Sequence, residues 1–205
     1  MDKAFGPFTV APGQVSSLGV RFTPFVNELL RVAASAAGLE AGQLTTTYRD
    51  NIGDMGVDAG LRRAISTKYI PAGDSAWQFK AGDLQPGKCR TELRGTQKTG
   101  EPASLAILRA GGSYRLVLGA DLNNALVARR RAALEDQART LGINIRPGMF
   151  EVLNASDLAA WATEHPSLAV SPLLEGIGLA VRPFASWSES SRPEARGSPL
   201  PLAPS

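Results

Sequence analysis

The sequence predicts one α/β domain of three layers, in which helices cover both faces of a mixed central β-sheet. Two observations predict this class. Hydrophobic residues make up 43% of the 205 residues, which is enough for a well-packed globular core. Three consecutive strand-like segments are followed by alternating helix and strand patterns, so the elements have the order αβββαβ and then αβα.

The first half of the chain predicts one helix and an antiparallel set of three strands. Thr23 can cap the helix, Pro24 suits its first turn and Gly38 ends it. Three strand-like segments, rich in β-branched or alternating apolar residues, follow it and are joined by turns. The expected helix covers residues 24–37, and the expected strands lie within residues 44–50, 57–66 and 75–81.

The second half predicts alternating helices and strands. The apolar segment "SYRLVLGA" favours a central strand, and Asn154 can cap the last helix, which stops before Pro166. The expected elements are a broken helix over 88–110, strands at 113–120 and 148–154, and helices at 123–141 and 154–165. Residues 1–21 are expected to form an arm, residues 22–185 the folded domain, and residues 186–205 a disordered tail.

Composition limits the possible chemistry. The net charge is only +3, although the pI of about 9.3 is compatible with an anionic partner. A single cysteine excludes an internal disulfide, and a single histidine with it excludes the usual zinc sites. The chain shows neither a signal-peptide pattern nor a membrane-spanning apolar run, so a cytoplasmic location is expected.

The segment "GDLQPGKC" (82–89) has the spacing of a phosphate-binding loop. Cys89 stands where such loops need a hydroxyl group for Mg²⁺. Pro86 removes one of the backbone N–H groups that would hold phosphate. An ordinary turn is therefore favoured here, and a nucleotide site using Gly82–Lys88 is the weaker alternative.

A stronger pattern precedes this loop. Asp58 begins an expected strand after a glycine-rich turn, and Gln78 and Lys80 lie two residues apart on another, hence on one face. If the two strands are neighbours, these three side chains can converge, and the backbone carbonyl of Phe79 remains available as a ligand. Oxygen ligands with a nearby cation are what Mg²⁺-dependent phosphodiester cleavage requires.

Other polar residues could complete such a site. Glu28 lies three residues after Phe25, on the inward side of the first helix, where a carboxylate needs a metal or a cation as its partner. Lys88, Arg90 and Arg94 follow the strand that contains Lys80, so they are candidates for contacts with a nucleic-acid backbone. The three arginines at 129–131 are expected on a solvated rim of the long helix.

The motif pair "GDMGVDAG…WQFKAG" resembles that of the PD-(D/E)xK restriction-endonuclease superfamily, and most closely its Mrr-type branch, with D…QxK. The resemblance covers residues 22–152 and implies a restriction-endonuclease-like sandwich. It implies that Asp58 and Gln78 bind the metal, that Lys80 is the catalytic lysine, and that Glu28 is an additional acid. Gln78 stands where an acid is commoner in the superfamily.

The downstream segments are similar to N-terminal nuclease modules of bacterial defence proteins that contain a STAND-type NTPase, which this chain lacks. The resemblance implies a Mg²⁺-dependent DNA endonuclease of anti-phage defence, in which Mn²⁺ can substitute. A homodimer or higher oligomer and a separate regulatory NTPase are further expectations. A nuclease-fold module without catalysis, serving binding or assembly, is the main alternative.

Overall fold

The fold is centred on a five-stranded mixed sheet with the strand order β1-β2-β3-β4-β5. The computed structural model describes residues 9–46, 57–94, 102–165 and 168. β1, β2 and β3 pair antiparallel, whereas β3, β4 and β5 pair parallel, so β3 is the strand at which the direction of pairing changes. The strands are β1 (Leu44–Thr46), β2 (Ala59–Ala64), β3 (Gly73–Lys80), β4 (Ser113–Leu118) and β5 (Phe150–Leu153).

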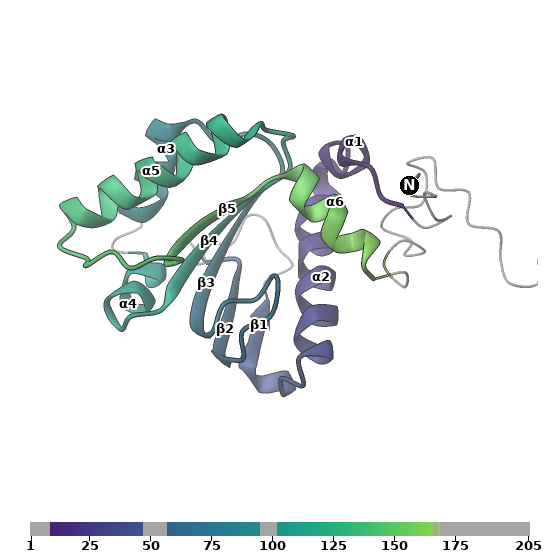
Figure 1. Ribbon diagram of the computed structural model, residues 1–205, viewed down its shortest axis with the longest axis horizontal. Helices are drawn as coiled ribbons and strands as arrows, with labels where there is room; N and C mark the ends of the chain where they lie inside the picture. Colours follow the sequence, from purple (N-terminus) through teal and green to yellow (C-terminus); the bar gives the residue numbers. More distant parts are fainter. Residues whose placement is uncertain (1–8, 47–56, 95–101, 166–167, 169–205) are drawn as a thin grey trace, which may run out of the picture.

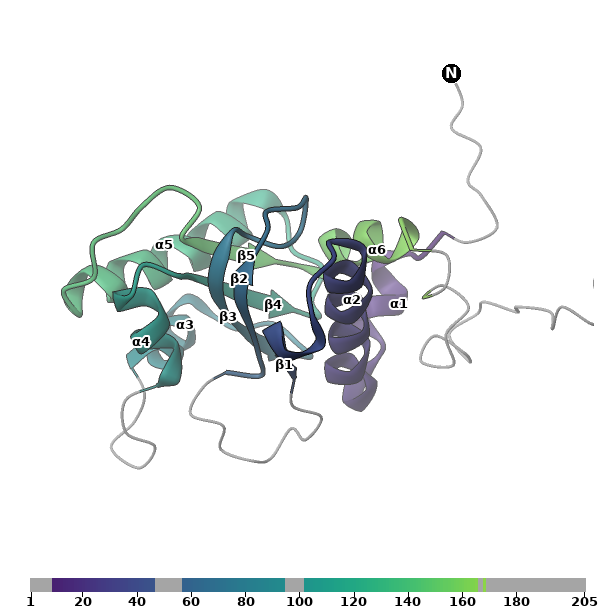
Figure 2. The ribbon, with the colours of Figure 1, turned by 90° about the horizontal axis from the view of Figure 1, so that it is seen from below.

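Helices cover both faces of this sheet, as Figures 1 and 2 show. One layer contains α1 (Pro12–Ser16), α2 (Phe22–Ala36) and α6 (Ala155–Thr163). The other contains α3 (Pro86–Arg94), α4 (Ala103–Arg109) and α5 (Asn124–Thr140). Two short 3-10 turns, Gly19–Arg21 and Ala41–Gln43, flank α2. The expected class, an α/β domain with a mixed sheet between helices, is therefore confirmed.

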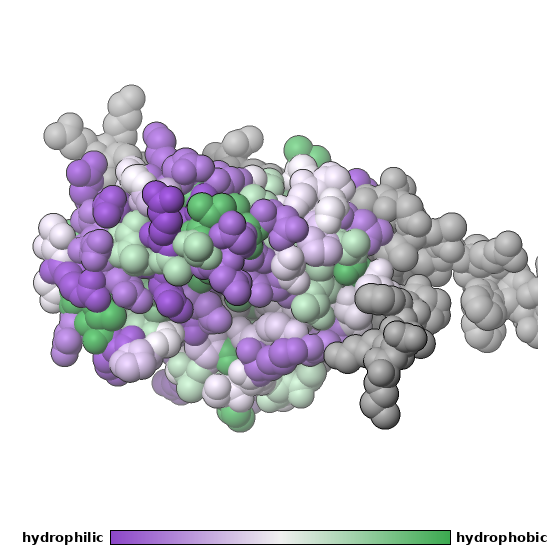
Figure 3. Space-filling view, turned by 45° about the horizontal axis from the view of Figure 1, so that its top comes forward, coloured by the Kyte–Doolittle hydropathy of each residue, from purple (hydrophilic) through white to green (hydrophobic). Residues whose placement is uncertain are grey.

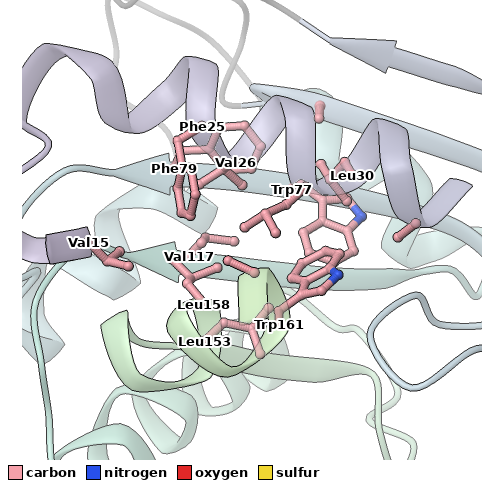
Figure 4. Close-up of a cluster of buried hydrophobic side chains, with 14 of the residues drawn as sticks. Val15, Phe25, Val26, Leu30, Trp77, Phe79, Val117, Leu153, Leu158 and Trp161 are labelled. Carbon is pink, nitrogen blue, oxygen red and sulfur yellow. The ribbon is translucent and has the colours of Figure 1, made fainter. Parts of the chain in front are cut away.

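The layer of α2 and α6 packs on a cluster of buried aromatic side chains. Trp77 and Phe79 of β3 point into it, and Phe25 and Trp161 meet them from the two helices (Figure 4). Tyr69, in the connection between β2 and β3, stacks on Trp161 with a centroid distance of 4.6 Å. Because side chains alternate along a strand, Gln78 lies on the opposite face of the sheet.

That opposite face packs on α3 and α5. β4 is buried along its whole length, and Tyr114, Leu116 and Leu118 contribute to a second core cluster with residues of these helices. Cys89 and Leu93 of α3 belong to the same cluster. Lys80 therefore ends β3 on the side of the sheet that α3 covers.

The N-terminal segment differs from the expected arm. Residues 9–21 contain α1, and Val10, Val15 and Leu18 are buried in the core cluster. The Val10 amide also donates a 3.0 Å hydrogen bond to the Thr163 hydroxyl of α6. Three buried apolar side chains thus fix residues 10–18 to the core, although residues 1–21 were expected to form an arm.

Where the structure describes them, the remaining boundaries agree within a few residues, whereas residues 47–50 of the first expected strand and residues 95–101 of the expected broken helix lie outside the described residues. α2 starts at Phe22, so Thr23 lies inside the helix instead of capping it. Asn154 caps α6 as expected, accepting a hydrogen bond from the Asp157 amide. The expected tail at 186–205 lies outside the described residues. No helix in the described part of the chain is long and apolar enough to cross a membrane.

The surface is mainly polar. Figure 3 shows hydrophilic residues over most of the visible face, with apolar groups scattered between them. The large apolar side chains that are exposed in the described ranges are Val20 and Ile65. Scattered apolar residues of this kind are normal for a protein surface.

Candidate active site

The sheet brings the predicted residues to one of its ends. β3 ends at Lys80, and β2 runs antiparallel to it, so the start of β2 lies beside the end of β3. The pairing of Ala59 with Trp77 places Asp58 next to Gln78. The Asp58 amide, just before β2, donates a 2.8 Å hydrogen bond to the Trp77 carbonyl.

The Asp58 carboxylate is fixed by β3. Its Oδ2 accepts hydrogen bonds from the Gln78 Nε2 amide at 2.7 Å and from the Phe79 backbone N–H at 2.6 Å. Two donors from one strand fix both the position and the orientation of this carboxylate. The expected meeting of Asp58 and Gln78 is thus present in the structure.

The Gln78 side chain has an unsatisfied oxygen. It is only 6% exposed, and its Oε1 atom is buried without a hydrogen-bond partner, while its Nε2 atom donates to Asp58. An unpaired buried acceptor costs about 1–3 kcal/mol. A hard cation beside Asp58 would give this oxygen a partner, since Mg²⁺ prefers carboxylate and amide oxygens. The donor set therefore fits a divalent metal ion.

Lys80 has a partner that the sequence analysis missed. Its Nζ lies 3.2 Å from Oε2 of Glu92 on α3, and the two side chains are 33% and 23% exposed. Glu92 follows buried Cys89 by three residues, so its helical position faces the sheet. That spacing, which drew attention to Glu28, would also have pointed to Glu92.

Tyr114 of β4 is a buried residue near Asp58 and Glu92. Its side chain is fully buried on β4, and its hydroxyl has no hydrogen-bond partner among the described residues. Burial raises the pKa of Tyr114 well above its ordinary value, and the nearby negative charges of Glu92 and Asp58 raise it further. This tyrosine therefore stays neutral at physiological pH.

Glu28 does not join this group. It is half-buried on α2, whose Phe25 packs in the cluster on the opposite face of the sheet. It forms no hydrogen bond or ion pair with Asp58 or Lys80 in the described ranges. No group of three His, Cys, Asp or Glu side chains with metal-binding geometry occurs among the described residues.

The expected nucleic-acid contacts are on the outside of α3. Lys88, Arg90 and Arg94 are exposed, and Arg90 lies 3.6 Å from the Asp136 carboxylate of α5. They stand on the helix that also contains Glu92. Their exposed side chains are accessible to a nucleic-acid backbone.

The loop that would bind phosphate in the nucleotide alternative, residues 82–89, contains the carboxylate of Asp83. Asp83 receives two hydrogen bonds from the Arg130 guanidinium, at 2.9 and 2.7 Å. The backbone N–H groups of Lys88 and Cys89 donate to the Gln85 carbonyl, as in an ordinary helix start. A carboxylate in the loop opposes phosphate binding, so this geometry gives the nucleotide alternative little support.

Cys89 and Arg130 both belong to the interior. Burial raises the pKa of the Cys89 thiol to about 11, so the thiol is protonated at neutral pH and is a packing group. Arg130 is 1% exposed, which corrects the expectation that all three arginines at 129–131 are solvated. Its guanidinium also donates to the Leu84 and Leu126 carbonyls, and these contacts allow the charge to be buried.

Comparisons of this chain with protein-family models, with curated proteins and with solved structures found no match.

A substitution at Gln78 tests the metal site without an activity assay. Gln78→Glu would place a second carboxylate beside Asp58. We therefore expect the free energy of unfolding of the metal-free variant to fall by about 1–3 kcal/mol. Mg²⁺ should then raise the melting temperature of Gln78→Glu more than that of the wild type. At a free Mg²⁺ concentration of 100 times Kd, binding of the ion adds about 2.7 kcal/mol to the free energy of unfolding.

The matched control is Gln85→Glu. The Gln85 amide donates to Asp83 at 2.7 Å on the surface, so this change creates the same pair of neighbouring carboxylates away from the site. Its melting temperature should respond to Mg²⁺ no more than that of the wild type. Equal Mg²⁺ responses of the two variants would contradict a metal site at Asp58 and Gln78.

Proposed function

We propose that this protein is a metal-dependent endonuclease that hydrolyses DNA phosphodiester bonds, with Mg²⁺ or Mn²⁺ as its cofactor. The observation that supports this most is the hydrogen bond from the Gln78 amide to the Asp58 carboxylate. It lies near the end of β3, where Lys80 is the last residue. Oxygen ligands beside a lysine at one sheet end suit phosphodiester chemistry. Nothing in the arrangement requires a histidine or a thiolate.

The Asp58 carboxylate and the Gln78 Oε1 atom would hold the ion, together with the Phe79 backbone carbonyl. Bound there, Mg²⁺ would act as a Lewis acid on a phosphate oxygen. The buried Gln78 acceptor without a partner supports this assignment. Because Gln78 is neutral, most of the charge that attracts the ion comes from Asp58.

Lys80 would stabilise negative charge that develops on the scissile phosphate. Its ammonium group is half-buried and held by Glu92, so its position is set before substrate arrives. A cation that is preorganised in this way lowers the barrier without the cost of reorientation.

Supercoiled plasmid tests the proposal directly. Purified protein with Mg²⁺ or Mn²⁺ should convert it to nicked or linear DNA, and EDTA should stop the conversion. Closed circular single-stranded DNA and a labelled RNA of the same length would separate DNA from RNA specificity. Intact plasmid after incubation with both metals would contradict the proposed activity.

A further inference from the structure

A groove extends from the candidate active site along β2. It has a volume of about 370 Å³, and its lining includes Thr45, Asp58, Gly60 and Ile107 of α4. A Cβ atom at Gly60 would come within 3.3 Å of the Thr45 hydroxyl oxygen, so glycine keeps this part of the groove open. Asp58 therefore belongs both to the candidate metal site and to the groove.

A β-bulge determines which side chains line the other end of the groove. Leu61 pairs with Ser75, and Ala64 pairs with Gly73, so β2 has one residue more than β3 between these pairs. Leu61 and Ala64 both pack in the core on the α2 side. The extra residue therefore lets two consecutive arginines, Arg62 and Arg63, lie outside that core and line the groove.

The bulge is maintained against a local conformational preference. Arg63 has a φ of +51°, a left-handed conformation that residues other than glycine rarely adopt. The Asp74 carboxylate supports it by accepting a 2.8 Å hydrogen bond from the Arg63 amide. A glycine would suit this backbone better, so what the arginine contributes is its side chain.

Neither guanidinium is neutralised within the described part of the protein. Arg62 and Arg63 are exposed, and their side chains form no ion pair with any described residue. Asp74, the other acid at this end, is engaged by the Arg63 backbone. Two unpaired guanidinium groups in a groove form a site for an anionic chain, since arginine matches the geometry of phosphate.

We propose that this groove binds the DNA strand that is cut at Asp58, with Arg62 and Arg63 contacting phosphates of that strand on one side of the scissile bond. The inference rests on the proposed nuclease function for the place of cleavage, but not for the binding itself. Asp58 and Arg62 are four steps apart along an extended chain, and at about 3.3 Å per step the distance between them is about 13 Å. This distance corresponds to roughly four phosphates along the axis of a B-form strand.

Binding in EDTA isolates the groove from catalysis. The affinity of the full chain for fluorescein-labelled 20-mers, duplex or single-stranded, is measured by fluorescence anisotropy over a salt series. Arg62→Ala and Arg63→Gly should each weaken duplex binding about 5- to 10-fold at 0.1 M salt and reduce the slope of log K against log salt by about 0.9. Arg63→Gly should also melt at an unchanged or higher temperature, since glycine accepts this φ.

Arg129→Ala is the matched control. Arg129 is exposed on α5, outside the groove lining, and its loss changes the net charge equally. The inference is overturned if the wild type does not bind DNA, if Arg62→Ala and Arg63→Gly keep the wild-type affinity and slope, or if Arg129→Ala weakens binding as much as they do. A groove that binds DNA without plasmid cleavage would overturn the nuclease proposal alone.

Discussion

Replacing Lys80 with alanine is expected to lower the rate of metal-dependent DNA cleavage by about 100-fold or more, the usual cost of removing one preorganised electrostatic contact. Lys80 is the last residue of β3, two residues after Gln78, and its ammonium group is held by Glu92. Its loss should reduce the rate in single turnover at saturating DNA. The affinity for DNA should change little, because the contact is made mainly in the transition state.

Lys88→Ala provides the matched control for this prediction. Lys88 is exposed on α3, so the variant removes the same charge from a neighbouring position. We expect it to weaken DNA binding at most and to keep the single-turnover rate. A melting temperature near that of the wild type would show that Lys80→Ala is folded, and wild-type cleavage by that variant would remove Lys80 from the site.

Replacing Asp83 with alanine is expected to destabilise the fold by about 3 kcal/mol, because it leaves the Arg130 charge buried without its partner. Arg130 is 1% exposed and donates to both carboxylate oxygens of Asp83. For a chain of this length the melting temperature should fall by roughly 6–12 °C. Thermal unfolding followed by far-UV circular dichroism measures the effect.

Two further variants sharpen this prediction. Asp136→Ala removes a carboxylate whose ion pairs are at the surface, and should change stability by less than about 1 kcal/mol. The double variant Asp83→Ala/Arg130→Met removes the buried charge as well, so it should recover part of the lost stability. Equal losses for Asp83→Ala and Asp136→Ala would mean that the Arg130 pair contributes little.

The order of the elements and the Asp58–Gln78 contact could be predicted because both follow from local periodicity. Alternation along a strand fixes the face on which Gln78 and Lys80 lie, and short turns between the first strands predict that they are neighbours. Because Ala59 pairs with Trp77, Asp58 lies opposite Gln78 on the neighbouring strand. The nuclease assignment remains a prediction that depends on these same residues.

What escaped prediction depends on partners that are remote in sequence. Arg130 has the sequence pattern of a surface residue, and only the packing of Asp83, from the loop between β3 and α3, shows that it is buried. The bulge at Arg63 depends on pairing with β3 and on the Asp74 side chain. Glu28 and Glu92 had equivalent helical positions, and only the packing of α2 and α3 on opposite faces distinguishes them.

The aromatic cluster has a consequence for how unfolding can be observed. Trp77 and Trp161 both lie in the core between the sheet and the layer of α2 and α6, whereas the residues around Lys80, Glu92 and Tyr114 lie on the other face. The intrinsic fluorescence of these two indoles therefore reports on one half of the molecule. Loosening of α3 would be nearly invisible in their emission, and the half that contains the candidate active site would need a reporter of its own.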